Sequence, residues 1–238
     1  MTGQHGRFGK TLIRMFMKQA QVTAVETLAG GFHLISLQSD AFRGVAWAPG
    51  QKVQVAMGSA FTARTFTPVD WNAISGRTRI VGYAHGDGPG AQWLRSVKPG
   101  APCDVFGPRA SLDPSGVQGE PVVFGDETSM GLVYALAQRF PHQKLHGILE
   151  VSHAARAGEV IARLALEGVE IHERLPEDAH FPAVERRFAA LAATPASFVL
   201  TGKATSIQHA SRALKALGVS RARMMSKAYW SPGKTGLD

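Results

Sequence analysis

The hydrophobic pattern of this sequence changes near Glu120, and that change limits the possible folds more than any other feature. Before it, short alternating segments such as 20–26 and 77–84 are typical of β-strands separated by glycine-containing turns. After it, short apolar segments alternate with amphipathic helices. The first part therefore predicts a small antiparallel β-barrel, and the second part predicts an open, doubly wound parallel α/β sheet.

The expected elements follow from these two patterns. In the first part we expect strands at 20–26, 32–38, 52–56, 63–68, 77–84 and 102–106, and one short helix at 90–96. In the second part we expect strands at 121–124, 145–151, 169–172, 196–200 and 223–228, and helices at 129–139, 157–167, 181–192 and 206–217. Residues 1–18 are expected to form a mobile or helical arm. Turn formers in 112–119 place the domain boundary there, which gives domains 1–116 and 117–238.

Charge and composition narrow the class of partner. The 238 residues carry a formal net charge of +8, so an anionic partner is expected. Nucleic acid, a membrane surface, a phosphorylated cofactor and an anionic metal chelate all satisfy this charge. No apolar run is long enough to span a membrane, and the single Cys103 excludes an intramolecular disulfide framework. We expect a cytoplasmic protein that does not bind membranes and is a monomer.

The segment Arg64–Thr67 has the residue types of a flavin nucleotide site. Arginine pairs with phosphate through two parallel hydrogen bonds, and an aromatic ring at Phe66 can pack on a flat heterocycle. The hydroxyl of Thr67 can reach a polar ring edge. Downstream, the glycine-rich stretch 85–93 opens a helix whose backbone N–H groups can hold a pyrophosphate. The alternative for Phe66 is a core position, whereas a tryptophan at position 93 more often packs a helix against the barrel than contacts a ligand.

Two features of the second part suggest a ligand at the sheet. The loop 125–128 follows the first buried strand, and open α/β sheets bind ligands at the carboxyl ends of their strands. After the second strand there is no acidic residue to read a ribose 2′-hydroxyl, but Arg156 could accept a 2′-phosphate. This favours NADPH over NADH, and a solvated loop is the alternative explanation.

Other chemistries find little support in the sequence. There is no His-x-x-x-His or His-Glu-x-x-His pair, no Gly-x-Ser-x-Gly elbow, and the Gly-Lys-Thr at 233–235 lacks the upstream glycine of a P-loop. No catalytic acid, base or nucleophile is predicted. Basic residues enrich the C-terminal part, where they form either a solvated face or a surface that attracts an anionic chelate: Arg212, Lys215, Arg221, Arg223, Lys227 and Lys234.

Four motifs in order resemble those of the siderophore-interacting protein family, flavin-containing reductases built on the ferredoxin-reductase plan. They are the flavin motif at 64–67, with Phe66 in place of tyrosine, the strand and Gly-Pro segment at 81–93, the Gly-Asp-Glu-Thr loop at 125–128, and the Tyr-Trp segment at 228–233. The chain departs from the family with Val69 where arginine is usual, Gly90-Ala91 where Ala-Ser is usual, and Lys203 where an acidic residue is common. The resemblance covers about 19–233.

The resemblance implies FAD, reduction of a ferric siderophore and release of iron in the cytoplasm. NAD(P)H or a ferredoxin would supply the electrons, and the Fe(III) of an anionic siderophore would accept them. The implied cofactor-binding residues are Arg64, Thr65, Phe66, Thr67, His85, Gly88, Pro89, Gly90, Ala91, Trp93, Asp126, Glu127, Thr128, Arg156, Tyr229 and Trp230. The implied substrate-binding residues are Lys203, Lys227 and Arg223.

Two other functions remain open at this point. The chain could be another ferredoxin-reductase-type flavoenzyme with a different electron acceptor. It could also be a basic, non-enzymatic module that binds nucleic acid, for which the only support is the pI of about 10.0.

Overall fold

The computed structural model describes residues 17–57 and 62–233, and the chain divides into two compact units. The first unit extends to Thr27 and continues from Gly31 to Ser111, and the second takes Leu28–Gly30 and the chain from Leu112 onward. Nearly all of the predicted arm at 1–18 lies outside the described residues. The division falls next to the turn-forming stretch 112–119, and the domain limits 1–116 and 117–238 stay a prediction.

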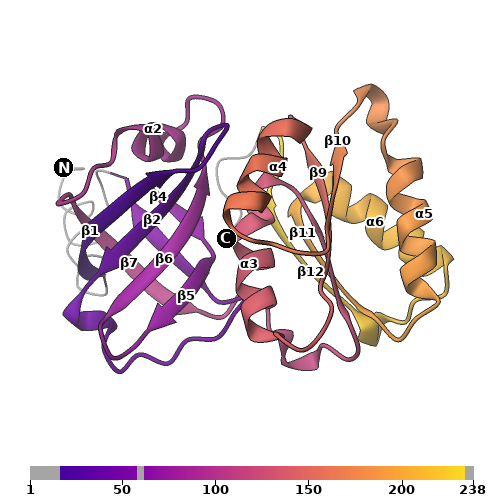
Figure 1. The fold of residues 1–238 in the computed structure, drawn as a ribbon, viewed down its shortest axis with the longest axis horizontal. Helices are drawn as coiled ribbons and strands as arrows, with labels where there is room; N and C mark the ends of the chain where they lie inside the picture. The colour runs from indigo at the N-terminus through magenta and orange to yellow at the C-terminus, as the bar shows by residue number, and fades with distance from the viewer. Residues whose placement is uncertain (1–16, 58–61, 234–238) are drawn as a thin grey trace, which may run out of the picture. The chain divides into compact units, whose positions relative to one another are not determined.

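The first unit is a seven-stranded antiparallel sheet in the order β4-β3-β7-β1-β2-β6-β5. Its strands are β1 (Lys18–Thr27), β2 (Phe32–Gln38), β3 (Lys52–Ala56), β4 (Ala63–Phe66), β5 (Pro68–Asn72), β6 (Arg77–Tyr83) and β7 (Pro102–Arg109). Val53 and Val55 are fully buried because alternate side chains of a strand point to the same face. The two edge strands, β4 and β5, are joined by Thr67 alone, so the sheet curls into the predicted barrel (Figure 1).

Two strand predictions in this unit were wrong in their limits. The expected strand 63–68 breaks at Thr67, and β5, which the sequence did not predict, begins at Pro68 and pairs with β6. Proline has no N–H to donate, so one continuous ladder through this position is disfavoured. The other error is β7, which passes the expected end at Phe106 and continues to Arg109, where a register shift lets it stay paired with β3.

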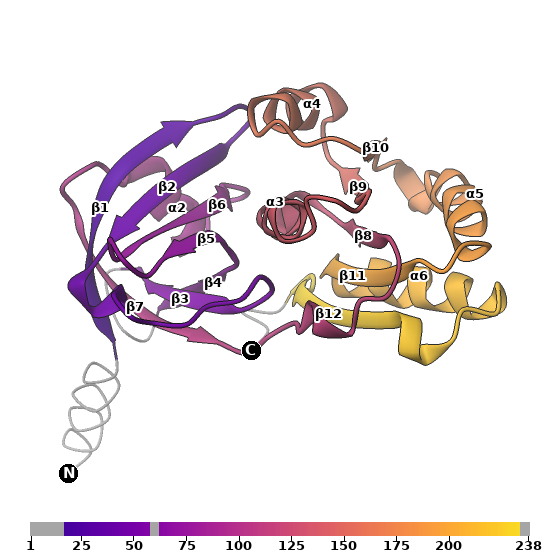
Figure 2. The same cartoon turned by 60° about the horizontal axis from the view of Figure 1, so that its bottom comes forward.

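The second unit is a five-stranded parallel sheet in the order β10-β9-β8-β11-β12. Its strands are β8 (Pro121–Gly125), β9 (His146–Val151), β10 (Val169–Glu173), β11 (Ser197–Lys203) and β12 (Met224–Trp230), and its helices are α3 (Met130–Arg139), α4 (Ala154–Arg163), α5 (Phe181–Ala192) and α6 (Ala204–Ala216). Helices α3 and α4 cover one face and α5 and α6 the other (Figure 2). The predicted doubly wound sheet is confirmed, and its strand order reverses between β8 and β11.

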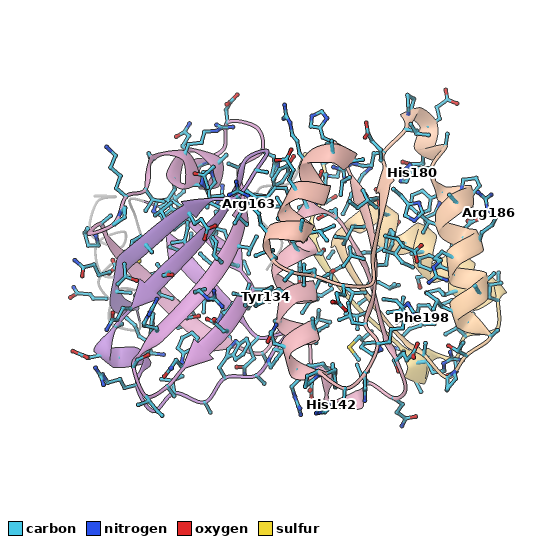
Figure 3. The ribbon with its side chains drawn as sticks, viewed as in Figure 1. Tyr134, His142, Arg163, His180, Arg186 and Phe198 are labelled. Carbon is cyan, nitrogen blue, oxygen red and sulfur yellow. The ribbon has the colours of Figure 1, made fainter. Side chains whose placement is uncertain are left out.

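The core of this unit explains why its strands are apolar runs rather than alternating ones. Phe124 and Phe198 are fully buried, and Phe188 from α5 meets Phe124 edge to face with ring centroids 5.5 Å apart. Figure 3 labels Phe198 in this core. Both faces of a parallel sheet are covered by helices, so both sets of side chains must be apolar.

Helix α4 begins earlier than the sequence predicts, at Ala154 rather than at 157, and ends at Arg163. Its first turn is held by a distant residue, because the Glu173 carboxylate accepts a hydrogen bond from the Ala154 N–H at 2.9 Å. A cap supplied from another strand leaves no local sequence signal. Across residues 17–57 and 62–233, no helix has the length and apolar character needed to cross a membrane.

Candidate functional site

The first unit brings Arg64 to the start of helix α2 (Pro89–Ser96). A Cβ atom built on Gly90 would lie 3.0 Å from Cγ of Arg64, so the arginine stem lies across the first helical turn. Arg64 is half-buried, and its Nη1 donates to the carbonyl of Ala63 at 2.8 Å. The first turn of α2 contains no acidic residue, and among the described side chains none caps its N-terminus at Gly88. A guanidinium beside uncapped helical N–H groups is a suitable environment for phosphate.

The aromatic residues of this site pack on each other and on the barrel. The rings of Phe66 and Trp93 have centroids 6.1 Å apart, and both side chains are half-buried against the apolar core of the barrel. The side chain of Ala91 is buried, with 6% exposure, so only its backbone could contact a ligand. Thr65 is exposed, whereas Thr67 is half-buried at the corner between β4 and β5.

The loop before α2 is held by side chains of the helix itself. Arg95 donates to the carbonyl of Gly86 at 2.7 Å, and Gln92 donates to the carbonyl of Asp87 at 2.9 Å. The exposed ring of His85 stacks on Tyr83 with centroids 5.5 Å apart. The sequence reasoning missed Arg95, which lies beyond the motif at 81–93, and gave no role to Tyr83 within that motif.

In the second unit, Asp126 is fully buried and its carboxylate is bonded on both oxygens. It accepts from the backbone N–H of Thr128 at 2.8 Å, from the Thr128 hydroxyl at 2.5 Å, and from Nε1 of Trp230 at 2.7 Å. Burial raises the pKa of Asp126, even though these hydrogen bonds act in the opposite direction. The carboxylate packs directly on Gly202, where a Cβ atom would lie 2.5 Å from Oδ2 and where φ is +92°.

The carboxylate of Glu127 is also bound by donors of its own chain. Its side chain is 5% exposed and accepts from the N–H of Ser152 at 2.6 Å and from Nη2 of Arg174 at 2.8 Å. Arg174 also donates to the carbonyl of Glu150 at 2.9 Å, which ties the ends of β8, β9 and β10 together. The sequence reasoning missed Arg174, because nothing in the sequence shows which strand ends are neighbours.

These contacts limit the role predicted for the acidic residues of the loop 125–128. The structure places Asp126 and Glu127 at the expected carboxyl end of β8, but with both carboxylates buried and paired. Thr128 is half-exposed, so of the three predicted residues only its side chain lies partly at the surface. The two acids therefore shape the loop, and a direct contact of either carboxylate with a cofactor is not supported by its position.

A second set of buried polar side chains surrounds Glu150 on β9. Glu150 is 1% exposed and lies 3.0 Å from Nε2 of His180 at the start of α5, which Figure 3 labels. His172 on β10 is the register partner of Glu150 on β9. Burial lowers the pKa of His172, opposed by Glu170 and helped by His180.

The three predicted substrate-binding residues lie at different positions along the strands of the parallel sheet. Lys203 ends β11 directly before α6 and is the register partner of Trp230, so it lies at the carboxyl ends of the strands. Lys227 is half-buried in the middle of β12. Arg223 lies before β12 at the opposite edge, where it donates to the carbonyls of Ala196, at 2.8 Å, and of Thr194. The expectation that Arg223 binds substrate is not supported, because its guanidinium ties the loop after α5.

Two other basic residues of the C-terminal part lie away from the carboxyl edge of the sheet. Lys215, in the last turn of α6, and Arg221 lie toward the amino ends of the strands, since α6 runs antiparallel to the sheet. The exposed Arg156 packs its stem on Gly30, where a Cβ atom would lie 2.7 Å from Cβ of Arg156. Lys234 lies outside the described residues.

Solved structures with a similar chain path include two siderophore proteins. One is the siderophore-interacting protein SipS from Aeromonas hydrophila, with a TM-score of 0.73 and 21% identity over 92% of this chain and 93% of that one. The other is a siderophore utilization protein from T. fusca, with a TM-score of 0.70 and 22% identity over 93% of this chain and 95% of that one. Phthalate dioxygenase reductase follows, with a TM-score of 0.71 and 14% identity over 92% of this chain and 70% of that one.

The chain has the ferredoxin-reductase fold. The resemblance to siderophore-interacting proteins that its motifs suggested is confirmed at the level of the fold, over nearly the whole chain. No protein-family model and no curated protein sequence matches it. Within the ferredoxin-reductase fold, the Arg64 site belongs to the barrel and the Asp126 loop to the parallel sheet.

Proposed function

We propose that this protein is a flavin oxidoreductase that binds FAD on its barrel and reduces the Fe(III) of an anionic siderophore, as a monomer in the cytoplasm. The observation that carries the proposal is Arg64 lying across Gly90, at the acid-free first turn of α2. The overall similarity to two siderophore proteins supports the choice of acceptor.

The barrel residues fit the chemical groups of FAD. Arg64 and the N–H groups that follow Gly88 and Pro89 suit the pyrophosphate, because a guanidinium and helical N–H groups both donate to phosphate oxygens. Gly88 has no atom within 4 Å of the position of an added Cβ, so there is room beside it. The neighbouring face of Phe66 suits the flat isoalloxazine, and the hydroxyl of Thr67 suits its polar edge.

Bound FAD would supply the redox chemistry, taking up an electron pair and passing electrons on singly. The residues of this chain bind and orient it, so no protein acid, base or nucleophile is required. Arg64 would anchor the pyrophosphate, His85 and the stretch 88–93 would hold the ribityl–pyrophosphate part, and Thr65–Thr67 would position the ring. NAD(P)H or a ferredoxin is the electron source, and Thr128, Lys203 and Tyr229 lie at the strand ends where a nucleotide would bind.

The acceptor is attracted by charge. A net charge of +8 raises the encounter rate with an anionic ferric chelate. Lys203 lies at the carboxyl end of β11, and Lys227 lies in the middle of the neighbouring strand β12. After reduction, Fe(II) is a poorer partner for hard oxygen ligands and leaves the chelate.

A spectroscopic experiment tests this function. Purified protein is reconstituted with FAD, and its visible spectrum is followed anaerobically during separate additions of NADH, NADPH and reduced ferredoxin. We expect a bound-flavin spectrum that bleaches with one of these donors, and then recovers as a ferric hydroxamate or catecholate siderophore is added and Fe(II) is trapped by ferrozine. A protein that stays colourless after reconstitution contradicts the proposal.

A second candidate is a ferredoxin-reductase-type enzyme with a protein acceptor. Its support is the similarity to phthalate dioxygenase reductase, described as a modular structure for electron transfer from pyridine nucleotides to [2Fe-2S]. Comparing a ferric siderophore with an oxidised ferredoxin as acceptor, at equal flavin occupancy, separates the two. The nucleic-acid alternative rests on the pI alone.

A further inference from the structure

Asp126 and Trp230 meet across a strand that lies between them. Trp230 ends β12 and Asp126 follows β8, and β11 separates these two strands in the sheet. The indole Nε1 nevertheless reaches the Asp126 carboxylate at 2.7 Å. The crossing is possible because β11 presents Gly202 at that point, where the position of a Cβ atom is taken by the carboxylate itself, 2.5 Å away.

This crossing lies at the one place where the strand order of the sheet reverses. The chain passes from β8 outward to β9 and β10, then returns to β11 and β12 on the other side of β8. In open α/β sheets, ligands bind beyond the carboxyl ends of the strands at this switch point. The bond between Asp126 and Trp230 therefore spans the ends of β8 and β11, where a nucleotide on this sheet would lie.

We propose that the Asp126–Trp230 hydrogen bond is a latch that holds the indole over the switch point, and that a nicotinamide nucleotide must open it to bind. The proposal rests on the proposed function in one respect, namely that a nicotinamide nucleotide is the electron donor. Asp126 is then a positioning residue, which acts on the ligand through Trp230.

The hydrogen-bond pattern of Asp126 makes the latch separable from the rest of the loop. One oxygen, Oδ1, serves the N–H and the hydroxyl of Thr128, and the other, Oδ2, serves Trp230. In Asp126→Asn, the amide oxygen can keep both Thr128 bonds while the amide NH₂ faces the indole N–H, so two donors oppose each other. This variant opens the latch and leaves the loop anchored. Trp230→Phe removes the donor and keeps an aromatic ring.

The test uses the FAD-reconstituted full chain in four forms: wild type, Asp126→Asn, Trp230→Phe and the control Asp113→Asn. Asp113→Asn is the same substitution in the same unit. However, the Asp113 side chain caps the short turn Pro114–Gly116 and binds no tryptophan. The chain has four tryptophans, so ¹⁵N-labelled protein gives four indole N–H signals, and Trp230→Phe identifies the one from Trp230.

In the wild type and in Asp113→Asn we expect the Trp230 indole signal to be protected from hydrogen exchange, and to lose that protection when NADH or NADPH saturates the protein. In Asp126→Asn the Trp230 indole signal should be unprotected even before nucleotide is added. Dissociation constants measured by calorimetry for the preferred nucleotide should fall about tenfold in both latch variants, the factor expected for one charge-assisted hydrogen bond that binding no longer has to break. They should be unchanged in Asp113→Asn.

Three results overturn the latch: a Trp230 signal that is unprotected in the free wild type, protection that survives nucleotide saturation, or equal or weaker nucleotide binding in both variants. If Asp126→Asn does not fold, Trp230→Phe alone decides. Failure of the latch is distinguishable from failure of the proposed function, because FAD binding and siderophore reduction by dithionite-reduced protein do not depend on the nucleotide.

Discussion

The two units place charged residues at their strand ends in opposite ways. In the barrel, Arg64 is half-buried, and its stem lies along a helix N-terminus that has no acidic residue in its first turn. In the parallel sheet, Asp126 and Glu127 are almost fully buried, and both bind donors of their own chain. The first arrangement presents positive charge to a ligand, whereas the second uses negative charge to build a loop.

The difference shows that a motif can identify a site without identifying the groups that contact the ligand. A carboxylate removed from water must be satisfied by several hydrogen bonds, and the groups that satisfy it are then fixed in place. Asp126 and Glu127 in this way fix Thr128, Trp230 and Ser152. These neighbours, rather than the acids, are the parts of the loop region that a ligand can reach.

The largest expected effect is on the stability of the second unit. Replacing Arg174 by methionine leaves Glu127 buried without its charged partner, which should cost about 3 kcal/mol of unfolding free energy. Urea denaturation followed by circular dichroism measures it. Arg186→Met, on the exposed face of α5 (Figure 3), is the matched control and should stay within about 0.5 kcal/mol. Equal stability of the two variants would mean that Glu127 is not held by Arg174, and the contrast between the units would fail.

The next effect is on cofactor binding by the barrel. Arg64→Ala should weaken FAD binding by about 2 kcal/mol, roughly 30-fold, because a charge-assisted hydrogen bond to phosphate is lost. Its unfolding free energy should hardly change, since the guanidinium is half-exposed. Arg64→Lys should recover part of the affinity, because it keeps the charge but loses the planar fork. Quenching of flavin fluorescence on binding reports the affinity, and full FAD affinity in Arg64→Ala would show that the site is elsewhere.

A smaller effect separates the two edges of the parallel sheet. Arg223→Ala should cost about 1 kcal/mol of stability, since it removes hydrogen bonds to the carbonyls of Ala196 and Thr194, and should leave the KM for a ferric siderophore unchanged. Lys203→Ala should do the reverse, raising that KM with little change in stability. Steady-state kinetics and denaturation of both variants test this. The opposite assignment would restore Arg223 as a substrate-binding residue.

The smallest effect is a pH dependence from His172. Burial lowers its pKa below the ordinary value of 6.5, so the unfolded chain takes up a proton at a higher pH than the folded one does. The contribution of His172 to stability is therefore present above pH 6.5 and is lost as the pH falls from there through the folded pKa. Denaturation of wild type and His172→Gln across pH 5 to 8 should show a shallower decline in the variant. Parallel curves would remove His172 as a contributor.

The sequence predicted most of the fold, because each element has its own local signal. The alternating segments of the barrel and the apolar runs of the sheet gave the strand types, and 181–192 matches α5 residue for residue. Errors occurred where a distant residue decides the local structure. Helix α4 starts early because Glu173 caps it, and the break at Thr67 was missed because β4 and β5 pair with different strands, β3 and β6.

The sequence predicted where the residues of the candidate site lie in the chain better than it predicted what their side chains contact. The sequence by itself determined that Arg64 lies in a strand before a glycine-rich helix start, and that Asp126 and Glu127 follow a buried strand, since these are properties of neighbouring residues. Only the tertiary structure decided that Arg64 meets Gly90, that Arg174 meets Glu127, and that Trp230 reaches Asp126 over Gly202. Those contacts join residues far apart in the chain, and the burial they create sets whether a charge is available to a ligand or is bound within the protein.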